Sequence, residues 1–356
     1  MVSAIREFVY SAPATRVIFG AGAIGHLARE IELLGAHRAL VLCTPEQTRE
    51  AERIATYLGS RAAGIYAKAV MHVPIETVRE ARATALRLGA DCAVAIGGGS
   101  TTGLGKAIAL DSGLPILAIP TTYAGSEMTP IFGLTEGRMK RTGRDPRVLP
   151  RSVIYDPELT LSLPLGLTLT SSMNAIAHAV EGLYSKDGNP IMDLMAEEGI
   201  RALADAMPKL KLCGQDIDAR SMALYGAWLC GMVLGNVGMA LHHKLCHTLG
   251  GSFGLPHAEV HTIILPHAVA YNAPAIGDAL LRINRALGSK DTAGALYDLA
   301  RDNGAPFALR DIGMRASDIA EAADISVANP YWNPRAIERD EIHALLQHAW
   351  EGKRPE

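Results

Sequence analysis

The stretch DCAVAIGGGSTTGLGKA, residues 91–107, joins a short apolar run to three consecutive glycines and then to a segment that can form a helix. Short runs of small and branched apolar residues are typical of buried strands. Glycines at the start of a helix leave several backbone N–H groups unhindered, and the helix dipole favours an anion there. The stretch therefore predicts a strand, a phosphate-binding turn and a helix in immediate succession.

The first half of the chain repeats this alternation. RALVLCT (38–44) and PILAIPTT (115–122) are further strand candidates, whereas residues 48–59 and 74–90 carry apolar residues at helical spacing. Short buried strands joined by helices indicate a parallel sheet with helices on both faces.

The second half has a different pattern, because strand candidates disappear after Pro157. Helical periodicity marks the segments 170–185, 189–211, 221–249 and 339–352. We therefore expect an α/β dinucleotide-binding domain over residues 1–158 and an all-helical catalytic domain over residues 159–356.

Composition excludes several classes of protein. A net charge of -3 argues against nucleic acid as the main partner, because phosphate binding needs a dominant basic field. The five cysteines are scattered, odd in number and contain no Cys-x-x-Cys, which predicts reduced thiols in a cytoplasmic protein. Residues 221–243 carry no formal charge, but their four glycines and the lack of a second such segment favour a buried helix over a membrane span.

Two glycine-rich turns could bind a dinucleotide. Residues 20–25 fit G-x-G-x-x-G, with Glu46 at about the right distance downstream, but a tight turn entering a helix explains this match equally well. Residues 97–102 follow a more apolar strand and open a helix. The segment PTTYAGSE (120–127) ends the next strand at the same sheet edge, so we prefer the turn at 97–102.

Six of the twelve histidines lie between residues 239 and 267. His243 and His247 are four apart on an expected helix and so project from one face, and Asn174 and His178 have the same spacing. His257 follows Pro256 in an expected loop. Such a set can converge on a metal or catalytic site, although buried histidines bonded to backbone carbonyls are the plainer alternative.

Two details of these helices follow from the same pattern. Ser171 or Ser172 could cap the helix that carries Asn174. A hard divalent ion prefers a carboxylate ligand, and Glu259 is the acid nearest in sequence to the clustered histidines.

The chain resembles the iron-containing (group III) alcohol dehydrogenases, and within them the maleylacetate reductase subgroup, over nearly its whole length. The resemblance rests on the segments GGGSTTGLGKA, AIPTTYAGSE, SSMNAIAHAVEGLY, HHKLCHTLGGSFGLPHAEVHTIILPH and NPYWNPR. It implies a Rossmann-like N-terminal domain, an all-helical C-terminal domain, an active site in the cleft between them, and a cytoplasmic homodimer.

The resemblance also implies which positions would hold a metal. In metal-dependent members an Asp and three histidines bind the ion, and these positions are Asn174, His178, His243 and His257 here. An amide oxygen is a neutral and weaker ligand than a carboxylate, so we expect a vestigial pocket with no required metal. Gly103 stands where the family usually has an Asp in the glycine-rich helix, which again matches the maleylacetate reductases.

The implied reaction is reduction of the carbon–carbon double bond of maleylacetate to 3-oxoadipate with NADH or NADPH, in bacterial degradation of aromatic compounds. Hydride adds β to the ketone, and a donor must stabilise the enolate oxygen. We expect His243 as the main electrophile, protonated, with His247 and His178 as further catalytic residues. His242, about 100° round the helix from His243, should tolerate replacement by Ala.

The remaining site residues are assigned on the resemblance. We expect the cofactor to contact Thr44, His72, Gly97, Gly98, Gly99, Ser100, Thr101, Thr121 and Thr122. Because the Thr44 hydroxyl can donate to a ribose hydroxyl or to a phosphate, both NADH and NADPH should serve. The dicarboxylate substrate should contact Asn174, His257, Tyr123, Lys140 and Arg335, with Lys140 in a basic stretch (137–151) that could equally be a solvated loop.

Two other functions remain open. A metal-dependent alcohol or polyol dehydrogenase of the same fold is disfavoured by Asn174. A non-catalytic dinucleotide-binding protein is disfavoured because His178, His243, His247 and His257 are all present.

Overall fold

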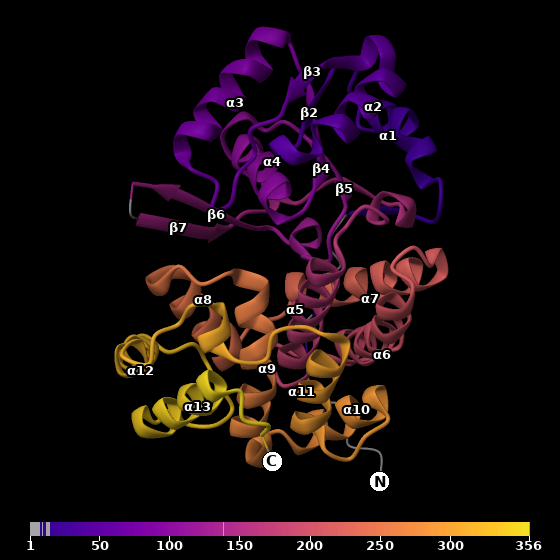
Figure 1. Cartoon of the computed structure of the whole chain (residues 1–356). Coiled ribbons are helices and arrows are strands. Elements are labelled where there is room, and N and C mark those ends of the chain that lie inside the picture. Colours follow the sequence, from indigo (N-terminus) through magenta and orange to yellow (C-terminus); the bar gives the residue numbers. More distant parts are fainter. Residues whose placement is uncertain (1–7, 9, 12–14, 138, 356) are drawn as a thin grey trace. The chain divides into compact units, whose positions relative to one another are not determined.

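The computed structural model describes residues 8, 10–11, 15–137 and 139–355. These residues fall into two compact units, one within Ala12–Leu163 and the other made mainly of Pro164–Glu356 (Figure 1). The first unit is an α/β domain and the second is helical. Both predicted fold classes are therefore confirmed.

The N-terminal unit is built on a six-stranded parallel sheet with the strand order β1-β8-β5-β4-β2-β3. Branched and small apolar residues fill the four inner strands, every residue of which is buried. The strands are β1 (Arg16–Phe19), β2 (Ala39–Leu42), β3 (Ala62–Tyr66), β4 (Cys92–Gly97), β5 (Ile116–Pro120) and β8 (Ser152–Tyr155).

Helices cover both faces of this sheet (Figure 1). Val41 packs in a core with residues of the helices α1 (Leu27–Leu33) and α2 (Thr48–Leu58). Its neighbour Leu40 points to the opposite face, into a core with α3 (Ile75–Leu88) and α4 (Gly99–Ser112). This alternation is the two-residue period of a strand buried on both faces. An antiparallel hairpin of β6 (Ile131–Glu136) and β7 (Met139–Arg144) packs beside α4.

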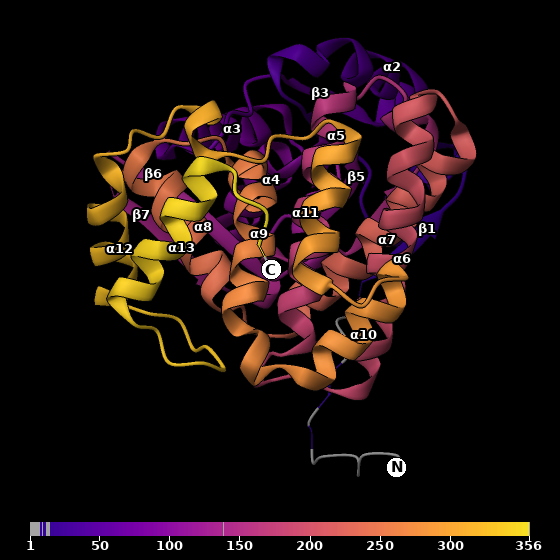
Figure 2. The ribbon, with the colours of Figure 1, turned by 60° about the horizontal axis from the view of Figure 1, so that its bottom comes forward.

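The C-terminal unit contains nine helices in its described residues. Its central helix α9 packs against α5, α8, α11 and α13 (Figure 2). The helices are α5 (Leu165–Leu183), α6 (Pro190–Leu212), α7 (Ile217–Asn236), α8 (Leu241–Phe253), α9 (His257–Asn272), α10 (Gly277–Leu287), α11 (Thr292–Asn303), α12 (Asp318–Ala328) and α13 (Arg339–Glu351).

Three local expectations were wrong. The uncharged segment 221–249 does not form one helix, because α7 ends at Asn236, α8 begins at Leu241, and the two helices are bent by 95°. α5 begins at Leu165, so Ser171 and Ser172 lie inside it, and the Ser172 hydroxyl donates to the Thr168 carbonyl instead of capping. His257 is the first residue of α9 rather than a loop residue.

No single helix among the described residues is long and apolar enough to cross a membrane. The bent pair α7–α8 meets the length and composition required only when its two helices are taken together.

Candidate active site

The turn after β4 is built so that only glycine fits. Gly97 has φ 147°, and a Cβ there would lie 2.5 Å from Gln47 Oε1. A Cβ on Gly98 would lie 2.8 Å from the Thr122 hydroxyl. The backbone is therefore bare where it enters α4, as close approach of a phosphate requires.

Hydrogen bonds join this turn to the loops after the neighbouring strands. The Thr121 N–H donates to the Gly97 carbonyl (3.1 Å), and Gln47 Nε2 donates to the Thr121 hydroxyl (2.8 Å). Thr44 lies two residues past the end of β2, directly before the short helical turn that contains Gln47. Gln47 was not predicted from the sequence, and its side chain links the loops after β2 and β5 at the carboxyl edge of the sheet.

The first glycine-rich turn is used by its own chain. The N–H groups of Gly22 and Ile24 donate to the two carboxylate oxygens of Asp156, at 3.2 and 3.0 Å. Because a carboxylate already accepts these hydrogen bonds, the turn has a structural role next to β8. This arrangement supports the choice of the turn at 97–102 for a cofactor.

His72 lies in a strained loop of the same unit. His72 and Val73 have φ of 66° and 46°, which is costly for residues other than glycine and most of all for a β-branched one. Thr135 holds the loop, since its hydroxyl donates to the His72 carbonyl (2.8 Å) and its N–H to the Val73 carbonyl (3.1 Å). A Cβ on Gly103 would lie 2.9 Å from Val73 Cγ2, so this loop occupies the space that an Asp side chain would need.

Two of the expected substrate contacts also belong to the N-terminal unit. Tyr123 is fully buried. Lys140 lies in β7, where it pairs with Thr135 of β6. The predicted hairpin is therefore present, with Lys140 in one of its strands.

Three helices of the C-terminal unit bring the clustered histidines together. α5 contributes His178, α8 contributes His243, and α9 contributes His261. The ring centroids of His178 and His261 lie 5.1 and 4.9 Å from that of His243. His247 lies 6.0 Å from His243, and His257 lies 4.2 Å from His261. The expected convergence of His178, His243, His247 and His257 is thus present, and His261 joins it.

His242 belongs to the same cluster, contrary to expectation. Its side chain is fully buried, its Nε2 lies 3.0 Å from the His261 carbonyl oxygen, and its Nδ1 lies 3.3 Å from His243 Nδ1. The α7–α8 break places it in the interior instead of on an outer face. His242 therefore cannot serve as a tolerant control for His243.

The functional residue that the sequence analysis missed is Glu181. Its fully buried carboxylate accepts hydrogen bonds from His243 Nδ1 (2.7 Å) and from the N–H groups of Ala240 (2.8 Å) and His242 (2.7 Å). Glu181 thus holds His243 by its Nδ1 and also accepts hydrogen bonds from N–H groups at the start of α8. It is the one formally charged residue of α5, three positions after His178, and an isolated acid in an apolar helix was the available signal.

The hydrogen bond that Glu181 accepts fixes the tautomer of His243. With Nδ1–H donating to the carboxylate, the Nε2 atom carries the free lone pair. This Nε2 has no hydrogen-bond partner among the described residues. His243 therefore presents one nitrogen that can accept a proton or donate one.

Burial controls the charges in this cluster. Burial, and then neighbouring histidines, lower the pKa of His178 and His243 well below the usual range, and burial also raises the pKa of Glu181. The pKa of His242 is lowered to about 4, mainly by burial. A permanently protonated His243 is therefore not supported. The exposed members of the set are His257 and His247, and Nδ1 of His247 lies 2.9 Å from the Tyr331 hydroxyl.

The donor atoms do not fit the iron site that a family of this kind implies. Asn174 Oδ1, His178 Nδ1 and His243 Nε2 are buried and have no partner among the described residues, so unused donors are present. They are an amide oxygen and imidazole nitrogens, however, and Glu181 directs its oxygens to N–H groups instead. Among the described residues, the one group whose donor atoms lie close enough to hold an ion consists of His242, His243 and His261, and it contains none of the carboxylates that accompany histidines at iron sites.

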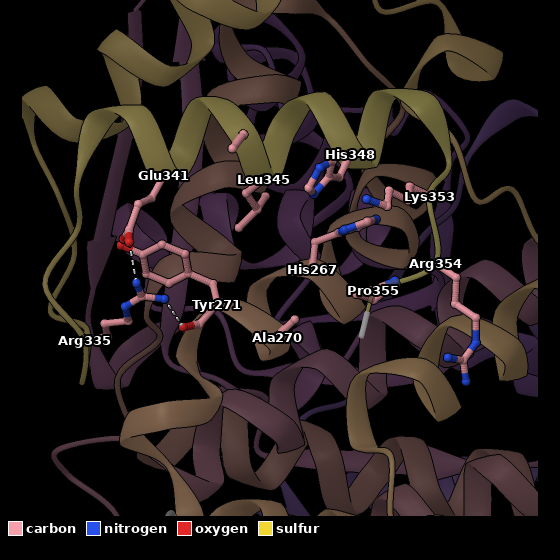
Figure 3. A pocket seen from close by; sticks show the side chains of 11 residues that line it. His267, Ala270, Tyr271, Arg335, Glu341, Leu345, His348, Lys353, Arg354 and Pro355 are labelled. Atoms are coloured by element: carbon pink, nitrogen blue, oxygen red, sulfur yellow. Dashed lines mark hydrogen bonds and ion pairs between the residues drawn. The ribbon is translucent and has the colours of Figure 1, made fainter.

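The hydrogen bonds and the ring contact of Arg335 are with residues outside the cluster of His178, His243, His247, His257 and His261. Its guanidinium donates to the Tyr271 carbonyl (2.8 Å) and to Glu341 (2.5 Å), and it stacks over the Tyr271 ring. It lines a separate cavity of about 380 Å³ together with His267 and His348 (Figure 3). Because its charge is already paired, the structure does not support Arg335 as a substrate contact.

Comparisons with known proteins cover both units. The family model described as "Iron-containing alcohol dehydrogenase" matches residues 14–157, and the model described as "Fe-containing alcohol dehydrogenase family, C-terminal" matches residues 168–350. The chain is 64% identical to a maleylacetate reductase of Burkholderia cepacia, over 99% of this chain and 100% of that one.

Solved structures agree with these matches. The crystal structure of maleylacetate reductase from Agrobacterium tumefaciens superposes with a TM-score of 0.96 at 52% identity, covering 99% of this chain and 100% of that one. An iron-containing alcohol dehydrogenase from Corynebacterium glutamicum superposes with a TM-score of 0.94 at 41% identity, covering 98% of each chain. The chain therefore belongs to the iron-containing alcohol dehydrogenase family.

Proposed function

We propose that the chain reduces the carbon–carbon double bond of maleylacetate with NADH or NADPH, giving 3-oxoadipate, and that it requires no metal. Its similarity to maleylacetate reductases over 99% of its length supports the substrate. The observation that carries the metal-free part of the proposal is Asn174, a neutral amide one helical turn before His178, together with Glu181, whose carboxylate is occupied by N–H groups. Reduction of a double bond conjugated to a ketone needs a proton donor at the ketone oxygen rather than a metal that activates an alcohol.

The chemistry of the site follows from the Glu181–His243 pair. A nicotinamide bound at the turn of residues 97–102 would supply the hydride. As negative charge develops on the ketone oxygen, a donor at His243 Nε2 or on His247 stabilises it. A proton on His243 Nε2 is stabilised from the other side of the ring by the Glu181 carboxylate, 2.7 Å from Nδ1. The same histidines can then deliver a proton to the carbon next to the ketone.

The loop after β2 bears on the choice of cofactor. The hydroxyl of Thr44 can donate to a ribose hydroxyl or to a phosphate, so we propose that both NADH and NADPH are used. A hydrogen bond from Thr44 lowers the pKa of Glu46, so an ionised carboxylate lies close by. This charge should weaken binding of the 2′-phosphate of NADPH without preventing it.

The two competing functions differ in what they require of the site. A metal-dependent alcohol dehydrogenase needs an anionic ligand, and the amide of Asn174 does not supply one. A non-catalytic dinucleotide-binding protein has no need of a buried Glu181–His243 pair, which costs stability unless the pair is used. We propose the enzyme, acting in the cytoplasm as a homodimer on a small dicarboxylate.

The test is the oxidation of NADH by the purified protein with maleylacetate, with identification of 3-oxoadipate as the product. The competing assay offers primary alcohols and diols with NAD⁺ in the presence of Fe²⁺ or Zn²⁺. Turnover in the first assay and none in the second is the expected result. The reverse pattern would establish the metal-dependent alternative.

A further inference from the structure

A dicarboxylate substrate needs cations, and one of the two expected from the sequence, Arg335, is already paired with a carboxylate. Arg335 is paired with Glu341 in a separate cavity, and Lys140 lies in the hairpin of the other unit. A cation of the C-terminal unit that lies beside the histidines is therefore a candidate partner for one substrate carboxylate.

Lys244 lies directly beside the histidines. It follows His243 in α8 and precedes His247 by three residues, a spacing that places Lys244 and His247 side by side on the helix surface. Its Nζ lies 6.0 Å from the centre of the Tyr331 ring, and the hydroxyl of that ring lies 2.9 Å from His247 Nδ1. Lys244, His247 and Tyr331 thus form one group at the open side of the histidine cluster.

Among the described residues, the charge of Lys244 has no ion-pair partner. It is the one formally charged residue of α8, and no described carboxylate lies within ion-pair distance of its Nζ. The side chain is half-buried, His247 is exposed, and Tyr331 is 39% exposed, so a ligand can reach the group. A half-buried ammonium without a partner is costly, and an anionic ligand would remove that cost.

We infer that Lys244 binds the carboxylate of the substrate that lies one methylene from the ketone. This inference rests on the proposed function. If His243 or His247 holds the ketone oxygen, a carboxylate two carbons away from the ketone carbon falls within reach of a neighbouring side chain on the same helix. The other carboxylate is attached to the carbon that accepts the hydride and lies on the far side of the ketone. Lys244 thereby selects β-keto acids over neutral ketones and alcohols.

The first test measures kcat and KM for maleylacetate at saturating NADH. Lys244→Met keeps the aliphatic stem and removes the charge, and it should lower kcat/KM roughly 10- to 100-fold, mainly through KM, as expected for one hydrogen bond to a charged group. Lys244→Arg should restore most of the loss, and the KM for NADH should stay unchanged. Lys290→Met, in an exposed loop with no ion pair among the described residues, is the matched control and should behave as the wild type.

The second test uses the wild type and both variants with maleylacetate esterified at the carboxylate next to the ketone methylene. With the ester, kcat/KM of the wild type should fall about as far as kcat/KM of Lys244→Met falls with the acid. Replacing the acid by the ester should then lower kcat/KM of Lys244→Met only a little further. Independent, additive losses, or an unchanged KM in Lys244→Met, would overturn the inference alone. A wild type that does not reduce maleylacetate would overturn the proposed function and this inference with it.

Discussion

Replacing Glu181 with Gln removes the carboxylate behind His243 while keeping the shape of the side chain. The two oxygens of Glu181 accept three N–H groups at 2.7–2.8 Å. An amide has a single acceptor oxygen. The favoured orientation of the Gln side chain places that oxygen toward His243 Nδ1 and the Ala240 N–H, because two of the three donors are then still paired. The amide NH₂ then faces the His242 N–H, which stays unpaired in a buried position.

The expected losses follow from this geometry. One buried N–H without a partner costs about 1–3 kcal/mol, so the free energy of unfolding should fall by that amount. The tautomer of His243 is kept, but a proton on its Nε2 loses the opposing negative charge. A hydrogen bond to a charged group contributes about 1.5–3 kcal/mol, which corresponds to a roughly 10- to 100-fold loss of activity. We therefore expect kcat for maleylacetate to fall within that range, with the KM for NADH unchanged.

The assay is NADH oxidation with maleylacetate, combined with urea unfolding of each variant. Glu259→Gln is the matched control, because Glu259 is the acid nearest in sequence to the clustered histidines and forms no ion pair among the described residues. It should keep kcat within a few-fold of the wild type. Full activity in Glu181→Gln at reduced stability would mean that the carboxylate is structural only, and the reasoning about His243 would be refuted.

Three further predictions concern single residues. His243→Ala should lower kcat by roughly 10²- to 10⁴-fold, the range for a positioned acid, whereas His348→Ala, at an exposed position outside the cluster, should have little effect; equal losses would argue against the assigned site. Thr44→Asp should impair NADPH far more than NADH, and a wild-type preference for either cofactor beyond about a thousandfold, on the order of 4 kcal/mol, would contradict the proposed use of both. Burial lowers the pKa of His242 and of His267 to about 4, so below about pH 6.5 the unfolded chain binds protons that the folded chain excludes. Each of these two histidines should therefore lower the free energy of unfolding by about 1.4 kcal/mol per pH unit between about pH 6.5 and pH 4. A free energy of unfolding that does not fall between about pH 7 and pH 5.5 would contradict this.

The sequence predicted those features that depend on local pattern. Alternating apolar runs and amphipathic segments predicted the parallel sheet. The three glycines at the junction of β4 and α4 predicted the turn, where a Cβ on Gly97 or Gly98 would collide with Gln47 or Thr122. The four-residue spacing of Asn174 and His178, and of His243 and His247, predicted that each pair lies on one face of a helix.

The features that were missed depend on tertiary packing. The break between α7 and α8 has no proline, and the N–H groups of Ala240 and His242 beyond the break are satisfied by Glu181, about 60 residues earlier in the chain. Without this long-range contact the uncharged segment resembles one continuous helix. The same contact buries His242, which helical geometry alone placed on another face, and it supplies the acid that local spacing could not reveal.

Metal content and activity, measured on the same sample, test the central claim most directly. The protein is dialysed exhaustively against a chelator, iron and zinc are quantified, and NADH oxidation with maleylacetate is compared before and after. Zinc is included because imidazoles alone can hold it. The account predicts unchanged turnover at far less than one metal ion per chain, and Asn174→Asp should bind divalent ions more tightly without gaining activity. Loss of turnover on chelation, with recovery on adding Fe²⁺ or Zn²⁺, would contradict it.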